Sequence, residues 1–159
     1  SGICTGTTSW NVSDIELSDG TNIITVRAYD ADGNAGLDSL TVTYILVVNF
    51  PDSNLEAAVR AEIDKPTGDI TVNDLQGMTS LFAGEQSIQN LEGLQYCTGL
   101  ANLYLEYNNI IDITPIVNNT GIGSGDVVYL YGNSLSETSC GQMIPALEER
   151  GVTVYHDCN

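Results

Sequence analysis

The sequence repeats itself in the stretches MTSLFAGEQSIQNLEGLQYCTG (residues 78–99) and LANLYLEYNNIIDITPI (residues 100–116). Six apolar positions recur at a spacing of 22 residues: Met78/Leu100, Leu81/Leu103, Ala83/Leu105, Ile88/Ile110, Leu91/Ile113 and Leu94/Ile116. A looser third copy follows after three extra residues and has Val128, Leu130, Asn133 and Leu135 at corresponding positions. A repeat of this length predicts one supersecondary unit per copy, and each unit buries its apolar side against the next.

The pattern L-x-L-x-x-N-x-I, which runs from Leu103 to Ile110, resembles the leucine-rich repeat, in which each unit contributes one short parallel strand. Residues 109–116 resemble the internalin-type bacterial subclass of this family. The resemblance implies that Asn108 and Asn133 belong to an asparagine ladder, which bonds backbone groups where the chain leaves each strand. The first copy has a glutamine at this position, which predicts a weaker first turn.

The segment before the repeats has helical character. Residues 52–63 carry apolar side chains at helical spacing with a capping box at residues 53–56, and a second short helix is expected over residues 71–76. The segment resembles the helical N-terminal cap of bacterial leucine-rich-repeat proteins, which covers the exposed apolar end of the repeats. We therefore expect an N-terminal cap over residues 51–77 and about three repeats over residues 78–136.

The segment after the repeats, residues 137–159, is predicted to be a second cap. Residues 139–150 have helical character and end before a glycine, and residues 152–155 read as a final strand. Cys140 and Cys158 bracket this unit, so we predict a disulfide between them. Closing that loop would stabilise the fold by about 3 kcal/mol in the chain-entropy model.

The first part of the chain alternates between apolar and polar side chains, as strands do. Residues 6–10, 17–26 and 28–34 resemble the C-terminal half of a bacterial Ig-like sandwich domain. In that family they form the last three or so of about seven strands. Residues 45–50 are expected to carry the last strand directly into the repeat domain.

Together, these patterns predict a mostly β chain with short helices. We expect a partial Ig-like β-sandwich over residues 1–46, followed by a short, capped leucine-rich-repeat solenoid over residues 47–159. Three strands cannot cover both faces of a sandwich core. The apolar face of the first domain is therefore expected to be covered by missing upstream sequence, by a partner chain or by the repeat domain.

The composition excludes several classes of partner. The formal net charge is −17, and the only fixed cations are Arg27, Arg60, Lys65 and Arg150. So acidic a surface repels phosphate groups, which argues against binding to nucleic acid or to anionic lipid. The longest apolar run is far shorter than a membrane span, so membrane insertion is not expected. The cysteines favour an oxidising compartment, and we expect an extracellular or cell-surface location.

We find no pattern that predicts an enzyme, a metal centre or a cofactor other than calcium. His156, the only histidine, precedes Asp157 and Cys158, but neighbouring residues on a strand point to opposite faces and the cysteine is expected to be in a disulfide. The cysteines show no zinc-ligand spacing. Cys97 occupies an apolar position of the repeat and is expected to be a buried thiol, while a bond between Cys4 and Cys97 is the alternative.

The strands are predicted to present an aromatic surface. Residues between the two apolar positions of L-x-L point away from the core, toward the concave face of the solenoid. The residues predicted to bind a ligand there are Phe82, Tyr104, Glu106, Tyr107, Tyr129 and Tyr131. Such aromatic groups suit stacking on sugars or protein side chains. The alternative is that the rings only pair across strands and stabilise the sheet.

Two further kinds of site follow from short motifs. Asp30, Asp32 and Asn34 offer alternate oxygen ligands for calcium, although the same string also forms an ordinary hairpin turn. Asn11 and Asn118 begin N-glycosylation sequons.

The leading hypothesis is a non-enzymatic extracellular or cell-surface module for binding or adhesion, which recognises a protein or carbohydrate ligand on its concave face. An alternative is a structural subunit of an extracellular filament or surface layer, which binds copies of itself through the incomplete Ig-like domain. A second alternative is an accessory domain of a secreted hydrolase. Because both folds host many functions, the fold class alone cannot choose among them.

Overall fold

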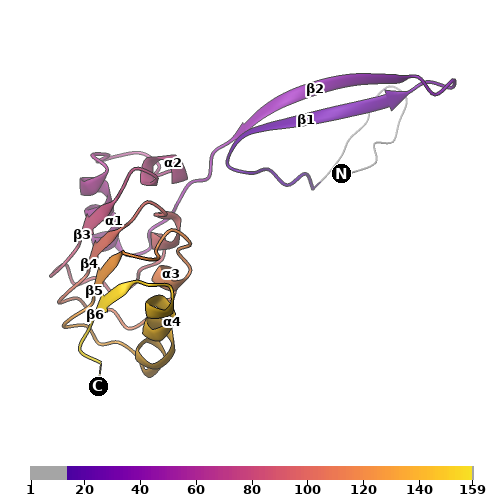
Figure 1. Ribbon diagram of the computed structural model, residues 1–159. Coiled ribbons are helices and arrows are strands. Elements are labelled where there is room, and N and C mark those ends of the chain that lie inside the picture. Colours follow the sequence, from indigo (N-terminus) through magenta and orange to yellow (C-terminus); the bar gives the residue numbers. More distant parts are fainter. Residues whose placement is uncertain (1–13, 159) are drawn as a thin grey trace. The chain divides into compact units, whose positions relative to one another are not determined.

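The computed structural model describes residues 14–158. The chain divides into two compact units, Ser1–Leu46 and Val47–Asn159 (Figure 1).

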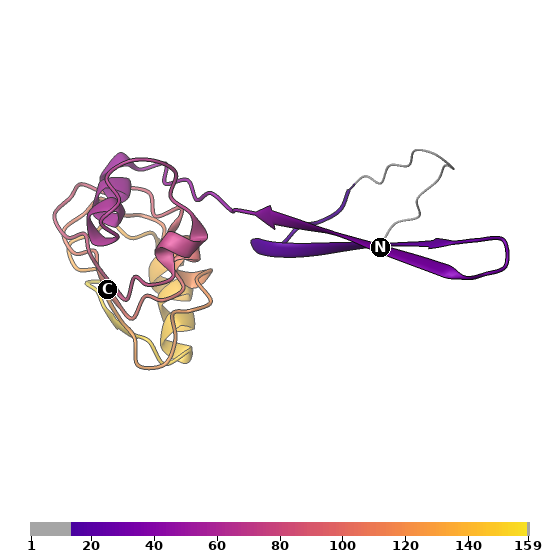
Figure 2. The same cartoon turned by 90° about the horizontal axis from the view of Figure 1, so that it is seen from above.

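The described part of the first unit is a long antiparallel hairpin of two strands, β1 (Gly20–Tyr29) and β2 (Ala35–Tyr44). Figure 2 shows the hairpin as a long, narrow ribbon. The register pairs Ile24 with Leu40, which places both on one face together with Val26 and Val42.

Two expectations for this unit differ from the structure. The alternation in the first part of the chain predicted strands before residue 19, but residues 14–18 form none, and Trp10 and Val12 lie outside the described residues. β2 also ends at Tyr44 and does not continue over residues 45–50. Beyond this point β1 offers no backbone partner, and the Leu46 N–H donates to the Asp19 carboxylate (2.7 Å) instead. The Ig-like assignment of residues 1–46 stays a prediction.

The second unit is built on a parallel sheet of four short strands in the order β3-β4-β5-β6. The strands are β3 (Ser80–Phe82), β4 (Asn102–Tyr104), β5 (Val127–Tyr129) and β6 (Thr153–Tyr155). Leu81, Leu103, Val128 and Val154 stand in register across the sheet. The strands are stacked along one side of the unit, while α2, α3 and α4 lie along the other (Figure 1). Each repeat therefore contributes one strand, as predicted.

The apolar core follows the repeat. All twelve residues at the six repeated positions are buried, with at most 4% of each exposed. Two glycines at equivalent positions allow successive turns to approach closely. A Cβ at Gly99 would stand 2.6 Å from the Gln76 carbonyl oxygen, and one at Gly121 would stand 1.9 Å from the Thr98 carbonyl oxygen. The spacing of 22 thus sets both the core and the closest backbone contacts.

Asparagine side chains connect successive repeats. The buried Asn108 accepts hydrogen bonds from the N–H groups of Gln86 and Ile88, both at 3.0 Å. Its amide nitrogen donates to the carbonyls of Ala83 (2.7 Å) and Leu105 (3.0 Å). Asn133 repeats this arrangement one turn later, so the asparagine ladder is confirmed at both positions.

The N-terminal cap contains α1 (Ser53–Glu62) and α2 (Val72–Leu75). The capping box expected at residues 53–56 is wrong, because Asp52 is the N-cap of α1. One carboxylate oxygen of Asp52 accepts from the second and third N–H groups of the helix region, at Asn54 and Leu55. The other oxygen accepts from two backbone N–H groups of the first repeat, at Gln89 and Asn90. Asp52 therefore joins the cap to the repeats.

The remaining helical segments are short. They are η1 (Leu94–Tyr96), α3 (Thr114–Val117), η2 (Ser139–Met143) and α4 (Ile144–Glu149). In the helical segment predicted over residues 139–150, Pro145 was expected to kink the helix or to start a second turn, and the structure has a π-helical turn, η2, followed by α4. Pro145 lies in the first turn of α4, where its missing N–H costs no helical hydrogen bond. None of the helices in residues 14–158 is long and apolar enough to cross a membrane.

The C-terminal cap carries the disulfide that was expected from the sequence. Cys140 and Cys158 are bonded, with their Cα atoms 5.8 Å apart. Gly151, with a φ of +86°, ends α4 and turns the chain toward β6.

Removing part of the stacked core should destabilise the second unit. Leu103 is fully buried on β4, so Leu103→Ala is expected to lower the free energy of unfolding by about 2–5 kcal/mol through the cavity it leaves. Phe82→Ala removes an exposed ring that stacks on one neighbour, and should cost only about 0.5–1.5 kcal/mol. Denaturant unfolding measures both values. Equal losses would contradict this division between inward and outward residues.

Acid should weaken the N-terminal cap. Lys65 donates to the Asp74 carboxylate (2.6 Å), and this bond, with those from Thr71, lowers the pKa of Asp74 from 3.8 to about 2. Because the folded-state pKa lies below the ordinary value, the ionised carboxylate stabilises the fold above pH 3.8. That contribution disappears as the pH falls toward 2.

Asp74→Asn should therefore unfold at a lower temperature than the parent chain at pH 7, and the difference should shrink as the pH falls from about 4 to about 2. Thermal unfolding of both proteins across this range measures the difference, and the comparison cancels effects of acid that both share. A difference that does not change with pH would contradict the role assigned to Asp74.

Candidate functional site

The strands carry a continuous row of stacked aromatic rings on the face directed away from the core. The members of this aromatic row are Phe82, Tyr104, Tyr129 and Tyr155, one on each strand. The three successive centroid distances are 4.7, 4.8 and 4.8 Å, and the ring planes differ by 8°, 8° and 14°. These spacings match the distance between neighbouring strands. The parallel register therefore stacks the rings.

Tyr155 was not among the residues predicted from the sequence. β6 follows β5 at a spacing of 26 residues and lacks the L-x-L pattern, so the repeat alone did not identify it. The sequence feature that could have identified Tyr155 is the pair Val154–Tyr155, in which an inward apolar residue is followed by an aromatic one. The same pair occurs at Leu81–Phe82 on β3.

The stacking determines which parts of the rings are accessible. Tyr104 and Tyr129 each have a neighbouring ring on both faces, so their faces are covered and only their edges and hydroxyl groups remain for a ligand. Phe82, at one end, has a neighbour on one face only and is 65% exposed. Tyr155, at the other end, also contacts Tyr131, whose centroid is 6.2 Å away. The rings do pair across strands, and this leaves few faces for stacking on a ligand.

The environment of Tyr129 favours its neutral form. Burial raises the pKa of the Tyr129 hydroxyl, and the neighbouring Tyr104, Tyr155, Glu106 and Tyr131 raise it further. The central phenol therefore stays protonated and can donate a hydrogen bond throughout the neutral pH range.

A second row of residues lies beside the aromatic row, two positions further along each turn, and consists of Gly84, Glu106 and Tyr131. Parallel backbone hydrogen bonds continue there, from the Glu85 N–H to the Glu106 carbonyl (2.9 Å) and from the Tyr107 N–H to the Tyr131 carbonyl (2.7 Å). The Glu106 side chain leans over Gly84, where a Cβ would stand 3.1 Å from its carboxyl carbon. Glu106 thus occupies the space that Gly84 leaves open.

Glu106 is incompletely hydrogen-bonded. Its Oε2 atom is buried and has no hydrogen-bond partner among the described residues. It is the one buried side-chain nitrogen or oxygen in residues 14–158 with this property. A buried, unpaired carboxylate oxygen is costly, because it has lost its contact with water without gaining a donor.

Tyr107 completes this face. Its backbone has a φ of 56°, and its ring is 63% exposed and packs beside Gly132. A Cβ at Gly132 would stand 2.4 Å from the ring, and the φ of Gly132 is +68°. Glycine is therefore required at this position. Of the six residues predicted to bind a ligand, Phe82, Tyr104 and Tyr129 lie in the aromatic row and Tyr131 contacts its last ring. Glu106 and Tyr107 lie in the turn that follows β4, and the role of all six in binding stays a prediction.

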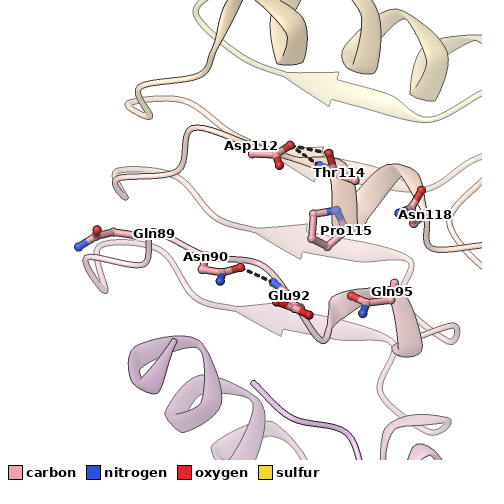
Figure 3. Close-up of a pocket in the computed structure, with 8 residues that line it drawn as sticks. All are labelled: Gln89, Asn90, Glu92, Gln95, Asp112, Thr114, Pro115 and Asn118. Carbon is pink, nitrogen blue, oxygen red and sulfur yellow. Dashed lines mark hydrogen bonds between the residues drawn. The ribbon is translucent and has the colours of Figure 1, made fainter. Parts of the chain in front are cut away.

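A polar groove lies elsewhere on the repeats, between two successive turns (Figure 3). It has a volume of about 540 Å³ and is lined by Gln89, Asn90, Glu92, Gln95, Asp112, Thr114, Pro115 and Asn118. Asn90 accepts a hydrogen bond from the Glu92 N–H (2.8 Å), and Asp112, one repeat later, accepts from the Thr114 N–H (2.8 Å). These oxygens stabilise the local turns. The sequence identified only Asn118 in this groove, as a glycosylation position.

The other predicted sites have structural explanations or stay predictions. The Asp30 carboxylate accepts from the N–H groups of Asp32 (3.0 Å) and Asn34 (2.8 Å), which accounts for the hairpin turn without a cation. Residues 14–158 contain no group of three or more His, Cys, Asp or Glu side chains placed to hold a metal. Calcium binding stays a prediction. Asn118 is exposed, Asn11 lies outside the described residues, and glycosylation at both also stays a prediction.

The described cysteines and the histidine have structural roles. Cys97 is a buried, free thiol, and burial raises its pKa to about 12, so it is unreactive at neutral pH. Cys4 lies outside the described residues. His156 accepts a hydrogen bond from the Cys158 N–H (3.1 Å), and Asp157 accepts from the Gly132 N–H (3.0 Å). His156 and Cys158 therefore have partners within the C-terminal cap, and Asp157 has one in the third repeat.

Comparison with known proteins supports the class of fold. No protein-family model matches the sequence, and a search of the curated proteins gives no match. Among solved structures, internalin C2 from Listeria monocytogenes is 31% identical, with a TM-score of 0.58 over 71% of this chain and 49% of that one. The chain thus spans about half the length of that structure.

Two further similarities are weaker. Internalin F from Listeria monocytogenes is 24% identical, with a TM-score of 0.42 over 57% of this chain and 33% of that one. The CBM51-2 and INT domains of ZmpB from Clostridium perfringens, solved in complex with GlcNAc, are 25% identical, with a TM-score of 0.45 over 58% of this chain and 21% of that one.

The repeated core, the parallel sheet and the similarity to internalin C2 together define an internalin-like fold of the leucine-rich-repeat type.

Proposed function

We propose that this chain is a non-enzymatic module for binding or adhesion that acts outside the cell, with the open face of its parallel sheet as the recognition surface. The open face comprises the aromatic row together with Glu106, Tyr107 and Tyr131. The observation that carries the proposal is the exposure of several large aromatic side chains on this one face, foremost Phe82 and Tyr107. Contiguous exposed groups of this kind commonly mark an interaction site.

Other features agree with this proposal. Aromatic side chains bury a large area at low entropic cost, and tyrosine is enriched among the residues that dominate binding energies. The Cys140–Cys158 disulfide fits an oxidising environment outside the cytoplasm. The similarity to internalin C2 supports a leucine-rich-repeat protein of the same kind, and a protein or carbohydrate ligand fits that surface.

The proposal predicts that binding depends on the exposed tyrosines. The chain would be tested against an array of immobilised glycans and extracellular matrix proteins. The ligand found should bind the double variant Tyr107→Ala/Tyr131→Ala at least about tenfold more weakly, because the loss of two interface aromatics removes more than about 1.4 kcal/mol.

Tyr96→Ala is the matched control, because Tyr96 is an exposed tyrosine on η1, outside the open face. It should leave the affinity unchanged. A ligand that binds the double variant as tightly as the parent chain would place recognition elsewhere on the molecule.

A second candidate function has its own supporting observation. We propose as the alternative that the chain is an assembly subunit that pairs through the hairpin of β1 and β2. Leu40 is 60% exposed on the face that it shares with Ile24, Val26 and Val42. A hairpin of two strands is marginally stable by itself, so a further strand or sheet against this face would stabilise it.

Assembly should depend on this face of the hairpin. Sedimentation velocity of the full chain is expected to show an average mass that rises with concentration, and Leu40→Ser should abolish the rise. Leu37→Ser is the matched control, since Leu37 is equally exposed but lies on the opposite face. A constant monomeric mass at every concentration would exclude this alternative.

A further inference from the structure

The open face combines an unsatisfied carboxylate with a lack of positive charge. Glu106 Oε2 is buried without a donor, as described above. The three fixed cations of the second unit each have a partner other than Glu106. Arg60 bonds to Glu56 (2.8 Å), Lys65 bonds to Asp74 (2.6 Å), and Arg150 contacts the Asn119 carbonyl (3.5 Å). None of these three cations therefore donates to Glu106, and a ligand would supply the donor that this carboxylate lacks among the described residues.

The ring geometry leaves few faces in the aromatic row on which a sugar could stack. A pyranose ring stacks on an accessible aromatic face, and the faces of Tyr104 and Tyr129 are covered by their neighbours at 4.7–4.8 Å. Within the aromatic row, the end ring with a neighbour on one face only is that of Phe82. Gly84 follows Phe82 by two residues on the same side of the chain, and the Glu106 carboxylate lies over Gly84. The Phe82 ring and the Glu106 carboxylate thus occupy successive outward positions, 82 and 84, of the same turn.

An arginine side chain fits this pair of groups. Its planar guanidinium can stack on an aromatic face and at the same time donate to a carboxylate, and it loses less hydration than a lysine ammonium does. The formal net charge of −17 would draw a basic segment toward the chain. The negative net charge of the chain and the covered faces of Tyr104 and Tyr129 therefore both favour a protein ligand over a carbohydrate.

We propose that the open face binds a basic protein segment through an arginine that stacks on Phe82 and pairs with Glu106. This inference rests on the proposed function and names the class of its ligand.

The test uses three probes: a synthetic peptide of alternating arginine and glycine, the same peptide with citrulline in place of arginine, and an oligosaccharide of GlcNAc. Citrulline keeps the shape and planarity of arginine but carries no charge. Isothermal titration calorimetry at physiological salt would measure each affinity for the parent chain, for Glu106→Gln and for Glu149→Gln. Glu149 is exposed at the end of α4, so its variant changes the net charge equally at a distant position.

The arginine peptide should bind the parent chain at least about tenfold more tightly than the citrulline peptide does. Glu106→Gln should weaken it by about tenfold, since a hydrogen bond to a charged group is lost, and Glu149→Gln should change it by less than about twofold. Glu106→Gln should unfold at the same temperature as the parent chain or higher, because it removes a buried unpaired charge, and this readout separates binding from folding.

Three results would overturn the inference. Equal losses in the two glutamate variants would mean that only the overall charge attracts the peptide. Equal affinities for the arginine and citrulline peptides would exclude a role for the cation. Tighter binding of the GlcNAc oligosaccharide, with a loss in Phe82→Ala, would assign the face to carbohydrate. In each case the Tyr107/Tyr131 experiment still decides separately whether the open face is a recognition surface.

Discussion

Asn108 supplies the interaction on which the stacking of the repeats depends. Each strand has only three residues, so the chain leaves the sheet among buried apolar side chains, where its backbone groups find no water. A single amide bonds backbone groups before and after this turn, and these groups belong to two successive repeats. Without it, several buried backbone groups would lose their partners at once. The ladder therefore holds the turns together where the sheet cannot.

The stacking that the ladder maintains also determines the character of the open face. Parallel strands in register place equivalent side chains one strand spacing apart, which is close to the contact distance of two flat rings. An aromatic residue at the same position of every strand must then form a closed stack. Along most of the row, only ring edges and hydroxyl groups are accessible to a ligand. The choice of ligand then depends on the rings at the ends of the row and on the neighbouring carboxylate of Glu106.

The sequence predicted those parts of the structure that follow from periodicity. The repeated apolar positions are all buried, and Asn108 and Asn133 bond the backbone as the resemblance implied. Features that depend on tertiary partners were missed. Asp52 is the N-cap of α1, and its second oxygen accepts from the first repeat, a contact 37 residues away in the sequence. Tyr155 was missed because the loops before β5 and β6 break the spacing, and the orphaned oxygen of Glu106 follows only from side-chain packing.

The alternation of side chains along each strand separates stability from recognition. Leu81 is fully buried while its neighbour Phe82 is 65% exposed, although the two share one peptide bond. A change at Phe82 therefore removes a contact from the open face and leaves the core intact, whereas a change at Leu81 opens a cavity in the core. Gly84 extends the same logic, because the missing side chain makes room for the Glu106 carboxylate. Residues that set ligand preference can thus vary at low cost in stability, provided that the buried ladder of the repeat is kept.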